Sequence, residues 1–368
     1  MASFIHVASS SQDRKWTVMH SVSTFTPMSA VQLLYQAALA TSPGKTAILN
    51  AQADPLLSQL AARKESLDLT QYFKPEHDAL TSMGFTVSPE FSKLSTDYDL
   101  ILLLPSKNKQ QTHAWMAEAM RRLQKNGKIM MACANRHGAK SHETALKALA
   151  GNISSASKSK CRIFSACRNN HFDNELAEQW IQDAKPRRIE THGLISQPGP
   201  FSWDRADTGS SLLLEQLPAL PGTGLDLCCG YGLLSEWILK HSPNVQLLHL
   251  IEADHIALEC ARANTQHWQT RVQLHWADAV SDPLPQNLDW IVCNPPFHSG
   301  QNRDIELGQA IVQRACQSLK KGGSLYLVAN RKLPYEHLLQ AGLQNCQTLI
   351  EKNGFKVFRG TGSRRHHE

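Results

Sequence analysis

Short apolar runs and amphipathic stretches alternate along the second half of the chain. Residues 224–232 read as a buried strand followed by a glycine turn, and 233–239 as an amphipathic helix. Further apolar strands are predicted at 245–251, 272–276 and 288–293. Strands that alternate with helices in this way predict an α/β fold built on a parallel sheet.

The end of the chain carries a different pattern. Gly322-Gly323 precedes an apolar strand at 325–329, and Asn353-Gly354 separates two apolar runs at 348–351 and 355–358. Asn-Gly between such runs is a strong hairpin signal. The sheet is therefore expected to end in an antiparallel hairpin.

The first half of the chain repeats the second. Residues 289–295, 319–323 and 330–331 align in order with 99–105, 123–127 and 135–136. A repeat on this scale predicts two tandem, duplicated Rossmann-like domains, and 368 residues are enough for each half to bury its own core. We expect the domains to span 1–185 and 186–368.

The glycine turn suits a nucleotide-like cofactor. Gly230 and Gly232 let the backbone approach a ligand closely, and the helix that follows presents free N–H groups. About 20 residues later, where doubly wound folds place the acidic residue that binds a ribose, the second strand ends at Glu252. The third strand ends at Asp278 and the fourth at Asn294. Polar residues at successive strand ends predict a ligand site at the carboxyl edge of the sheet.

The segment Asn294-Pro295-Pro296-Phe297 carries the candidate chemistry. An exocyclic amino group is a poor nucleophile because its lone pair is delocalised into the adjacent π system. Two carbonyls that accept its N–H bonds, from the Asn294 side chain and the Pro295 main chain, favour the pyramidal form whose lone pair faces an electrophile. The prolines hold the backbone rigid, and Phe297 can stack on a planar acceptor. The segment therefore predicts an amino group as a methyl acceptor.

The first copy lacks these features. Leu104 stands at the position of Asn294, and Lys107 at that of Phe297. The strand at 45–50 is followed by 51–54 without a glycine turn. We interpret the first copy as a degenerate domain that serves as a scaffold and has no cofactor site.

Together these motifs resemble a class I S-adenosylmethionine-dependent methyltransferase. Phe201-Ser202-Trp203-Asp204, continuing to residue 210, and the stretch 328–335 narrow the resemblance to bacterial ribosomal RNA (guanine-N2)-methyltransferases. The small-subunit methyltransferase C family is the most similar, with large-subunit methyltransferase G close to it. The family ends its parallel sheet with an antiparallel hairpin, as predicted here. One departure is Cys228, which stands where the family has the first glycine of the cofactor turn.

The resemblance implies how S-adenosylmethionine would bind. Glu252 would accept the ribose hydroxyls, Asp278 the adenine amino group, and Phe201 would close over the cofactor. The turn that would position the methionine moiety comprises Asp226, Cys228, Gly230 and Gly232.

The resemblance also implies how a guanine would be held. Unpaired or flipped, the base would lie against Phe297, with its N2 amine held by Asn294 and by the carbonyl of Pro295. Asn294 would thus border both cofactor and substrate. His298, the next residue, is a candidate RNA contact.

Charge is distributed unevenly along the chain. Residues 107–168 contain thirteen Lys and Arg against two Glu, a local excess of +11 in a chain of net charge +6. Such a field attracts polyanions, which predicts that the first domain docks ribosomal RNA or the small ribosomal subunit. The residues chosen as RNA contacts are Lys107, Lys109, Arg136 and Lys140.

Several classes of protein are excluded by composition. The first thirty residues are polar and interrupted by charges, unlike a signal peptide, and no apolar run is long enough to span a bilayer. Nine cysteines, an odd number, favour reduced thiols in the cytoplasm. No cysteine pairs have metal-ligand spacing, so we expect a metal-free monomer that does not bind membranes.

Two kinds of alternative remain open. The acceptor could instead be a guanine of 23S rRNA, adenine N6 or a protein glutamine, although a Tyr in place of Phe297 would have favoured the last two. Alternatively, Cys228 could mark a vestigial cofactor site in a non-catalytic RNA-binding factor for ribosome assembly.

Overall fold

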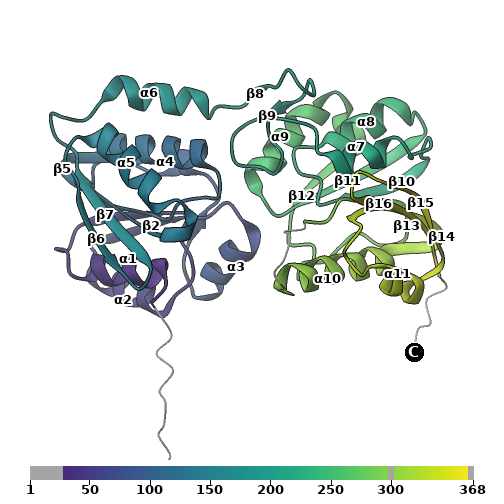
Figure 1. Ribbon diagram of the computed structural model, residues 1–368, viewed down its shortest axis with the longest axis horizontal. Helices are drawn as coiled ribbons and strands as arrows, with labels where there is room; N and C mark the ends of the chain where they lie inside the picture. Colours follow the sequence, from purple (N-terminus) through teal and green to yellow (C-terminus); the bar gives the residue numbers. More distant parts are fainter. Residues whose placement is uncertain (1–27, 297–301, 364–368) are drawn as a thin grey trace, which may run out of the picture.

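The computed structural model describes residues 28–296 and 302–363, which form two α/β domains lying side by side (Figure 1). Each domain contains one seven-stranded sheet, with the orders β3-β2-β1-β4-β5-β7-β6 and β12-β11-β10-β13-β14-β16-β15. In both sheets the first five strands pair in parallel, and the last two are antiparallel. The predicted fold class, two tandem Rossmann-like domains ending in a hairpin, is confirmed.

The strands of the first sheet are β1 (Lys45–Leu49), β2 (Ser66–Thr70), β3 (Val87–Ser88), β4 (Tyr98–Leu103), β5 (Leu123–Ala134), β6 (Ser154–Lys158) and β7 (Cys161–Cys167). Those of the second are β10 (Gly222–Leu227), β11 (Val245–Glu252), β12 (Val272–Trp276), β13 (Leu288–Cys293), β14 (Leu319–Asn330), β15 (Leu343–Lys352) and β16 (Phe355–Gly362). A small hairpin, β8 (Arg187–Arg188) and β9 (Ile195–Ser196), lies between the domains in sequence.

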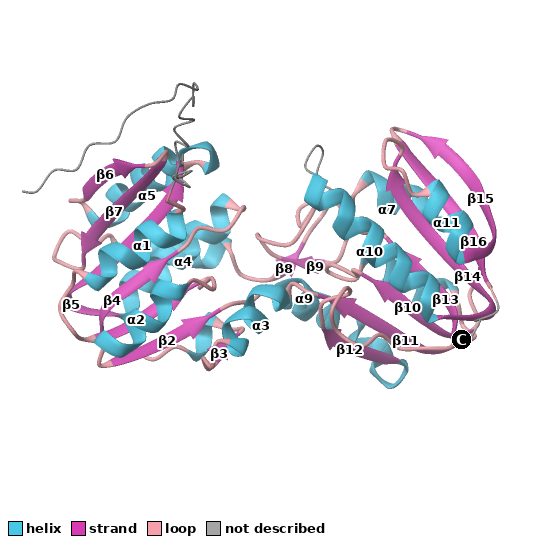
Figure 2. Ribbon diagram, turned by 90° about the horizontal axis from the view of Figure 1, so that it is seen from below, coloured by secondary structure: helices cyan, strands magenta, loops and turns pink. Residues whose placement is uncertain are grey.

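Helices cover both faces of each sheet (Figure 2). The first domain contains α1 (Ala30–Leu39), α2 (Pro55–Arg63), α3 (Lys74–Ser82), η1 (Phe91–Lys93), α4 (Lys109–Arg122), η2 (Asn135–His137), α5 (Ala139–Ala150) and α6 (Asn174–Asp183). The second contains α7 (Thr208–Leu214), α8 (Leu233–His241), α9 (His255–Thr265), η3 (Gln266–Arg271), α10 (Asn302–Ser318) and α11 (Glu336–Gly342). No helix in the described part of the chain is long and apolar enough to cross a membrane.

Strand β13 shows how one apolar run serves two cores. Trp290 and Val292 join the core beneath α7, α8 and α9, whereas Ile291 and Cys293 face the core beneath α10 and α11. Successive side chains of a strand point to opposite faces of the sheet, so a strand covered on both sides must be apolar throughout.

The duplication extends to individual contacts. Asp99 accepts a hydrogen bond from Lys45 N at 2.8 Å, and Asp289 accepts one from Thr223 N at 2.7 Å. Strands β5 and β14 have the same sequence of buried and exposed positions along all twelve residues. The two domains therefore share one backbone plan, which makes their positions comparable residue by residue.

The terminal hairpin has the predicted turn. Lys352 pairs with Phe355, and Asn353 and Gly354 between them have φ of 53° and 81°, as a two-residue hairpin turn of the type favoured by Asn-Gly requires. Strand β14 begins at Leu319, earlier than expected from its apolar part. An irregularity in the pairing with β13 lets the polar residues before Gly323 continue the strand.

The domains contact each other through a short backbone pairing. Residue Phe73 forms an isolated antiparallel bridge with Asp254, so residues 72–74 lie against 253–255. On the second domain, the contact lies in the loop directly after β11.

Candidate active site

The strand order brings four of the predicted site residues to one edge of the second sheet. Of the neighbouring strands, β12 ends two residues before Asp278 and β11 ends at Glu252. Strand β10 ends one residue after Asp226, and β13 ends directly before Asn294. All four strands are parallel, so their carboxyl ends meet at the same edge, where ligands bind in open α/β sheets.

Glu252 is held by main-chain donors. Gly230 N donates to Oε2 at 2.8 Å and Asp254 N to Oε1 at 3.0 Å. Burial raises the pKa of the Glu252 carboxyl above its ordinary value, and the N–H bonds from Asp254 and Gly230 offset only part of this effect. Each carboxylate oxygen has more than one lone pair, so the fixed group can still accept hydroxyl donors from a ligand.

Asp226 is fully buried beneath the turn. Ser235 Oγ donates to its Oδ2 at 2.6 Å, but no donor among the described residues reaches Oδ1. Burial raises the pKa of Asp226 to about 7, with an additional contribution from the negative charge of Glu252. A buried acceptor without a partner is costly and fits a site completed by a hydrogen-bond donor on a ligand.

The two glycines of the turn have different tasks. Gly230 has a φ of +56°, and a Cβ there would meet open space. Gly232 has a φ of +87°, and a Cβ there would lie 3.1 Å from Cβ of Ala261 on α9. Gly230 therefore leaves room for a close ligand, whereas Gly232 lets α8 pack against α9.

Cys228 occupies the left-handed conformation that glycine adopts most readily, with φ of +65°. Its side chain packs against the core beneath α10 and α11 and contacts the thiol of Cys293. The interaction with Cys293, followed by burial, raises the pKa of the Cys228 thiol. The thiol is thus accommodated by the core.

Asp278 closes a tight turn after β12. Its Oδ1 accepts from Val280 N at 3.0 Å and its Oδ2 from Ser281 Oγ at 2.7 Å. Its own N–H donates to Asp282 Oδ2 at 2.8 Å. The carboxylate at the end of β12 therefore has a fixed orientation.

The amide of Asn294 has only one orientation consistent with its neighbours. Its Nδ2 donates to Asp207 Oδ2 at 3.0 Å and to Ser210 Oγ at 2.8 Å, and Asp207 as a carboxylate can only accept. The Oδ1 atom is buried, and no described donor reaches it. The structure thus presents an unpaired carbonyl oxygen at the end of β13.

Asp207 and Ser210 were not recognised as site residues from the sequence. Asp207 is the N-cap of α7 and also accepts from Ser210 N at 2.8 Å. An Asp three residues before a Ser is a common helix start, so this local role concealed the contact with a strand more than eighty residues away.

The remaining candidates differ in exposure. Phe201 is 60% exposed in a turn before α7, and Pro295 is buried. Phe297 and His298 lie outside the described residues. No group of three or more potential metal ligands occurs within 28–296 and 302–363, and the expectation of a metal-free site stays a prediction.

Comparison with known proteins places this geometry in a family. Residues 32–183 match the family described as "Methyltransferase small domain N-terminal", and 191–359 match "Methyltransferase small domain". A ribosomal RNA small subunit methyltransferase C from Psychromonas ingrahamii is 31% identical over 78% of this chain and 82% of its own length. Its counterpart from Haemophilus influenzae is 30% identical over 83% of this chain and 91% of its own.

The chain belongs to the ribosomal RNA small subunit methyltransferase C family. The resemblance inferred from the motifs is confirmed, as is the prediction that the protein is a methyltransferase. A T. thermophilus 16S rRNA N2 methyltransferase, solved with AdoMet and guanosine, has the same fold, with a TM-score of 0.75 at 22% identity over 90% of this chain and 92% of that one.

In the first domain the corresponding edge is closed by its own side chains. Asn50, with φ of 57°, takes the place of Cys228, and Gln71 that of Glu252. Asn50 Nδ2 donates to Leu104 O at 3.0 Å, and Gln71 Nε2 donates to Asn50 Oδ1 at 3.1 Å. These bonds satisfy the polar groups internally, and no carboxylate stands where a ribose would need one.

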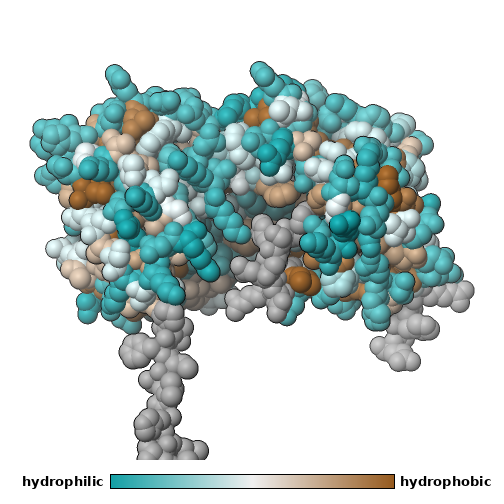
Figure 3. All heavy atoms as spheres, in the orientation of Figure 1, coloured by the Kyte–Doolittle hydropathy of each residue, from teal (hydrophilic) through white to brown (hydrophobic). Residues whose placement is uncertain are grey.

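Some basic residues of the first domain are paired, and others are exposed at the edge that corresponds to the candidate site. Arg121, Arg122 and Arg162 are engaged in ion pairs with Glu178, Glu118 and Glu143. The four residues selected as RNA contacts, Lys107, Lys109, Arg136 and Lys140, are exposed and follow the carboxyl ends of β4 and β5. The face drawn in Figure 3 is mostly hydrophilic over both domains, with only small hydrophobic patches.

The conformation of Cys228 predicts the effect of two substitutions. Cys228→Gly should leave S-adenosylmethionine affinity within about two-fold, because the thiol packs into the core. Cys228→Val should destabilise the protein by more than ~1 kcal/mol, because a β-branched residue tolerates the left-handed region poorly. Calorimetric titration and urea unfolding measure the two effects. A tenfold gain in affinity for the glycine variant would show instead that Cys228 crowds the cofactor.

The raised pKa of Asp226 predicts a pH-dependent stability. In the unfolded chain this carboxyl loses its proton near pH ~4, whereas in the folded protein it keeps it to about 7, so stability falls as pH rises between these values. Asp226→Asn removes this loss, and the free energy of unfolding of the variant relative to the parent should increase from pH 5 to pH 8.

Asp289→Asn is the matched control for this titration. Burial would raise the pKa of Asp289, but Lys320 and Thr223 N lower it overall, so it is ionised throughout this range. Its effect on urea unfolding should be constant from pH 5 to pH 8. A constant offset for Asp226→Asn as well would contradict the raised pKa.

Proposed function

We propose that this protein transfers the methyl group of S-adenosylmethionine to the exocyclic N2 amine of a guanine in 16S ribosomal RNA of the small subunit. The observation that carries the proposal is the Asn294 amide, whose NH₂ is tied to Asp207 and Ser210 and whose buried oxygen lacks a donor. The related proteins are named for small-subunit ribosomal RNA, and the T. thermophilus enzyme was solved with guanosine.

Asn294 would activate the amine by accepting one of its N–H bonds. An amide free to rotate could present NH₂ instead, which would repel an incoming amino group. The two acceptors, Asp207 and Ser210, prevent that rotation, so the site is set for the amine before the substrate arrives. The Pro295 carbonyl would accept the second N–H, and Phe297 would stack on the base.

The edge of the sheet fits S-adenosylmethionine. Glu252 would accept the ribose hydroxyls, Asp278 the adenine amine, and Phe201 would cover the cofactor. The open space at Gly230 and the unpaired Oδ1 of Asp226 fit a ligand with an ammonium group close to the turn. When bound, the cofactor supplies an electrophilic methyl group on a sulfonium. The buried Pro295 and Cys293 keep water away from the acceptor side.

The first domain would dock the RNA. Its four exposed basic residues lie at the edge of the first sheet that corresponds to the active edge of the second, and its own site is closed by Asn50 and Gln71. A protein that modifies ribosomal RNA would work in the cytoplasm, and one chain holds both the docking and the transfer site. A monomer is therefore sufficient for the proposed reaction.

The role of Asn294 is tested by removing its amide. Asn294→Ala should lower single-turnover methylation of small-subunit rRNA by at least ~10²-fold, the scale of removing a preorganised group that stabilises a transition state, while cofactor affinity changes only a few-fold. Asn345→Ala, on exposed β15, is the control and should be neutral. A variant at position 294 with most of its rate intact would remove the amine-holding role.

Docking by the first domain is tested by charge reversal. Replacing Lys107, Lys109, Arg136 and Lys140 by Glu should weaken RNA binding and flatten its salt dependence, because each phosphate that these residues no longer neutralise lowers the slope by up to about one. The chemical rate at saturating RNA should change little. Affinity across a salt series, with single-turnover rates, measures both.

The control reverses the same number of charges at the opposite edge of the same sheet. Arg63, Lys93, Lys125 and Lys147 are exposed and lie toward the amino ends of the parallel strands. If both quadruple variants weaken RNA binding equally, binding depends only on net charge, and the proposal that RNA docks at this edge is wrong.

A further inference from the structure

The domain interface touches the two loops assigned to the cofactor. Lys74 N donates to Ala253 O at 2.8 Å, and His255 N donates to Tyr72 O at 2.9 Å. With the bridge between Phe73 and Asp254, these bonds fix the backbone directly after Glu252. The loop that orients the ribose carboxylate is therefore paired with the first domain.

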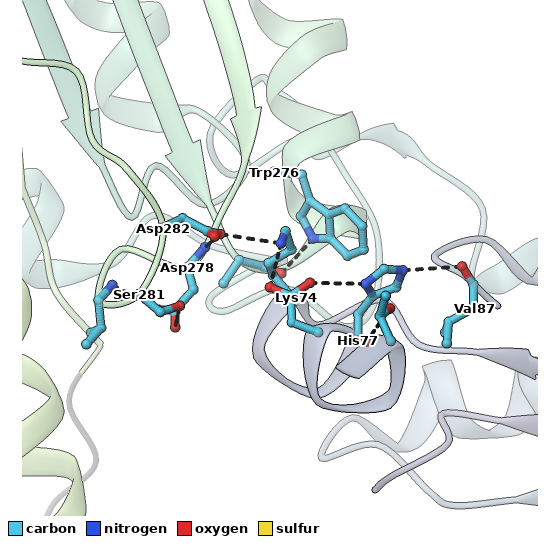
Figure 4. A network of polar contacts seen from close by, with 11 residues as sticks. Lys74, His77, Val87, Trp276, Asp278, Ser281 and Asp282 are labelled. Atoms are coloured by element: carbon cyan, nitrogen blue, oxygen red, sulfur yellow. Dashed lines mark hydrogen bonds and ion pairs between the residues drawn. The ribbon is translucent and has the colours of Figure 1, made fainter. Parts of the chain in front are cut away.

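The side chain of Lys74 reaches the second loop (Figure 4). Its Nζ lies 2.5 Å from Asp78 Oδ2, within α3, and 3.4 Å from Asp282 Oδ2, in the second domain. Burial alone would lower the pKa of Lys74, but Asp78 and Asp282 raise it overall, so the side chain is a cation. Its ammonium group therefore forms an ion pair with a carboxylate of each domain.

Asp282 in turn holds Asp278. Its Oδ2, the atom facing Lys74, accepts the N–H of Asp278 at 2.8 Å, and its own N–H donates to Asp278 O at 3.0 Å. The carboxylate oxygen thus links an ammonium of the first domain to the backbone of the residue assigned to adenine.

Trp276 joins the two loops. Its Nε1 donates to Ala253 O at 2.9 Å, the carbonyl that also accepts from Lys74 N. Lys74 Nζ lies 5.7 Å from the centre of its ring, and His77 packs edge-on against the ring at 4.7 Å. Both loops are therefore stabilised by one small set of contacts from α3.

We propose that Lys74 is a positioning residue for the cofactor site, which fixes from the first domain the loops that carry Glu252 and Asp278. The inference rests on the proposed assignment of these two acids to the cofactor. Lys74 does not touch the reacting atoms. It restricts the conformations of the two loops before the cofactor binds, so binding costs less conformational entropy. Because linkage is reciprocal, bound cofactor should also stabilise the domain interface.

The test is cofactor affinity of the full chain. Lys74→Met keeps the length of the side chain and removes its charge, and it should weaken S-adenosylmethionine binding by about 5- to 10-fold, the lower end of typical couplings between sites. The KM for the cofactor should rise equally, with kcat at saturating cofactor unchanged. Lys74→Arg should restore most of the affinity. A purely structural role would instead lower stability without this separation of KM from kcat.

Two further variants control the interpretation. Lys45 has a comparable setting inside the first domain, with Nζ 2.9 Å from Thr96 O and 4.8 Å from the centre of the Tyr98 ring, so Lys45→Met should leave affinity unchanged. Asp282→Asn removes the same ion pair from the second domain and should weaken binding like Lys74→Met. The double variant should be no weaker than either single one. If Lys74→Met folds poorly, Lys74→Arg and Asp282→Asn still test the inference from the two ends of the same ion pair.

Glu252→Ala separates failure of the inference from failure of the proposed function. If it weakens cofactor binding while Lys74→Met and Asp282→Asn leave it within two-fold, Lys74 is not a positioning residue and the proposed function stands. If Glu252→Ala itself has no effect, the assignment of Glu252 is wrong, and the inference falls with it.

Discussion

The parallel pairing of β10 with β11 and β13 is the constraint on which the site depends. Leu227 lies opposite Ile251 on one side and Cys293 on the other, so Cys228, Glu252 and Asn294 leave the sheet at the same level. A slip of one residue would turn every side chain of a strand to the other face. The apolar side chains buried on both faces of these strands fix the register. The register in turn fixes the positions of the polar residues at the strand ends.

The same backbone supports two different edges. In the second domain the buried atoms Asp226 Oδ1 and Asn294 Oδ1 are left without donors, which destabilises the protein alone but suits a site that ligands complete. In the first domain Asn50 and Gln71 pair with each other and with the backbone, so these two side chains are already satisfied without a ligand. The two edges thus differ in a few residues at strand ends, while the strand order of the two sheets is the same.

The first domain has retained contact with the active edge of the second through α3. Lys74 and the backbone around Phe73 meet the loops after β11 and β12. The two parts of the active edge therefore have different supports. The part proposed to bind the amine is held within the second domain by Asp207 and Ser210, and the part proposed to bind adenine and ribose is held across the interface.

The sequence by itself determined the fold and predicted which polar residues stand at the strand ends. Apolar runs with β-strand length, the glycine turn and Asn353-Gly354 are local signals, and the sheet followed from their order because parallel strands joined by helices have few possible arrangements. The aligned segments around Asp99 and Asp289 likewise allowed the duplication to be predicted from the sequence. Glu252, Asp278 and Asn294 were predicted as site residues because each lies within two residues of the end of such a strand.

Only the tertiary structure decided which partners orient those residues. Asp207 appears from the sequence to be only a helix cap, yet it also fixes the amide of Asn294 at the end of β13. Cys228 reads as an obstacle at a glycine position, yet its thiol lies in the core beside Cys293. Lys74 reads as one more charge on an exposed helix, yet it bridges two domains. Such contacts join residues far apart in the chain, and local pattern carries no information about which distant atoms the folded sheet will bring within hydrogen-bond distance.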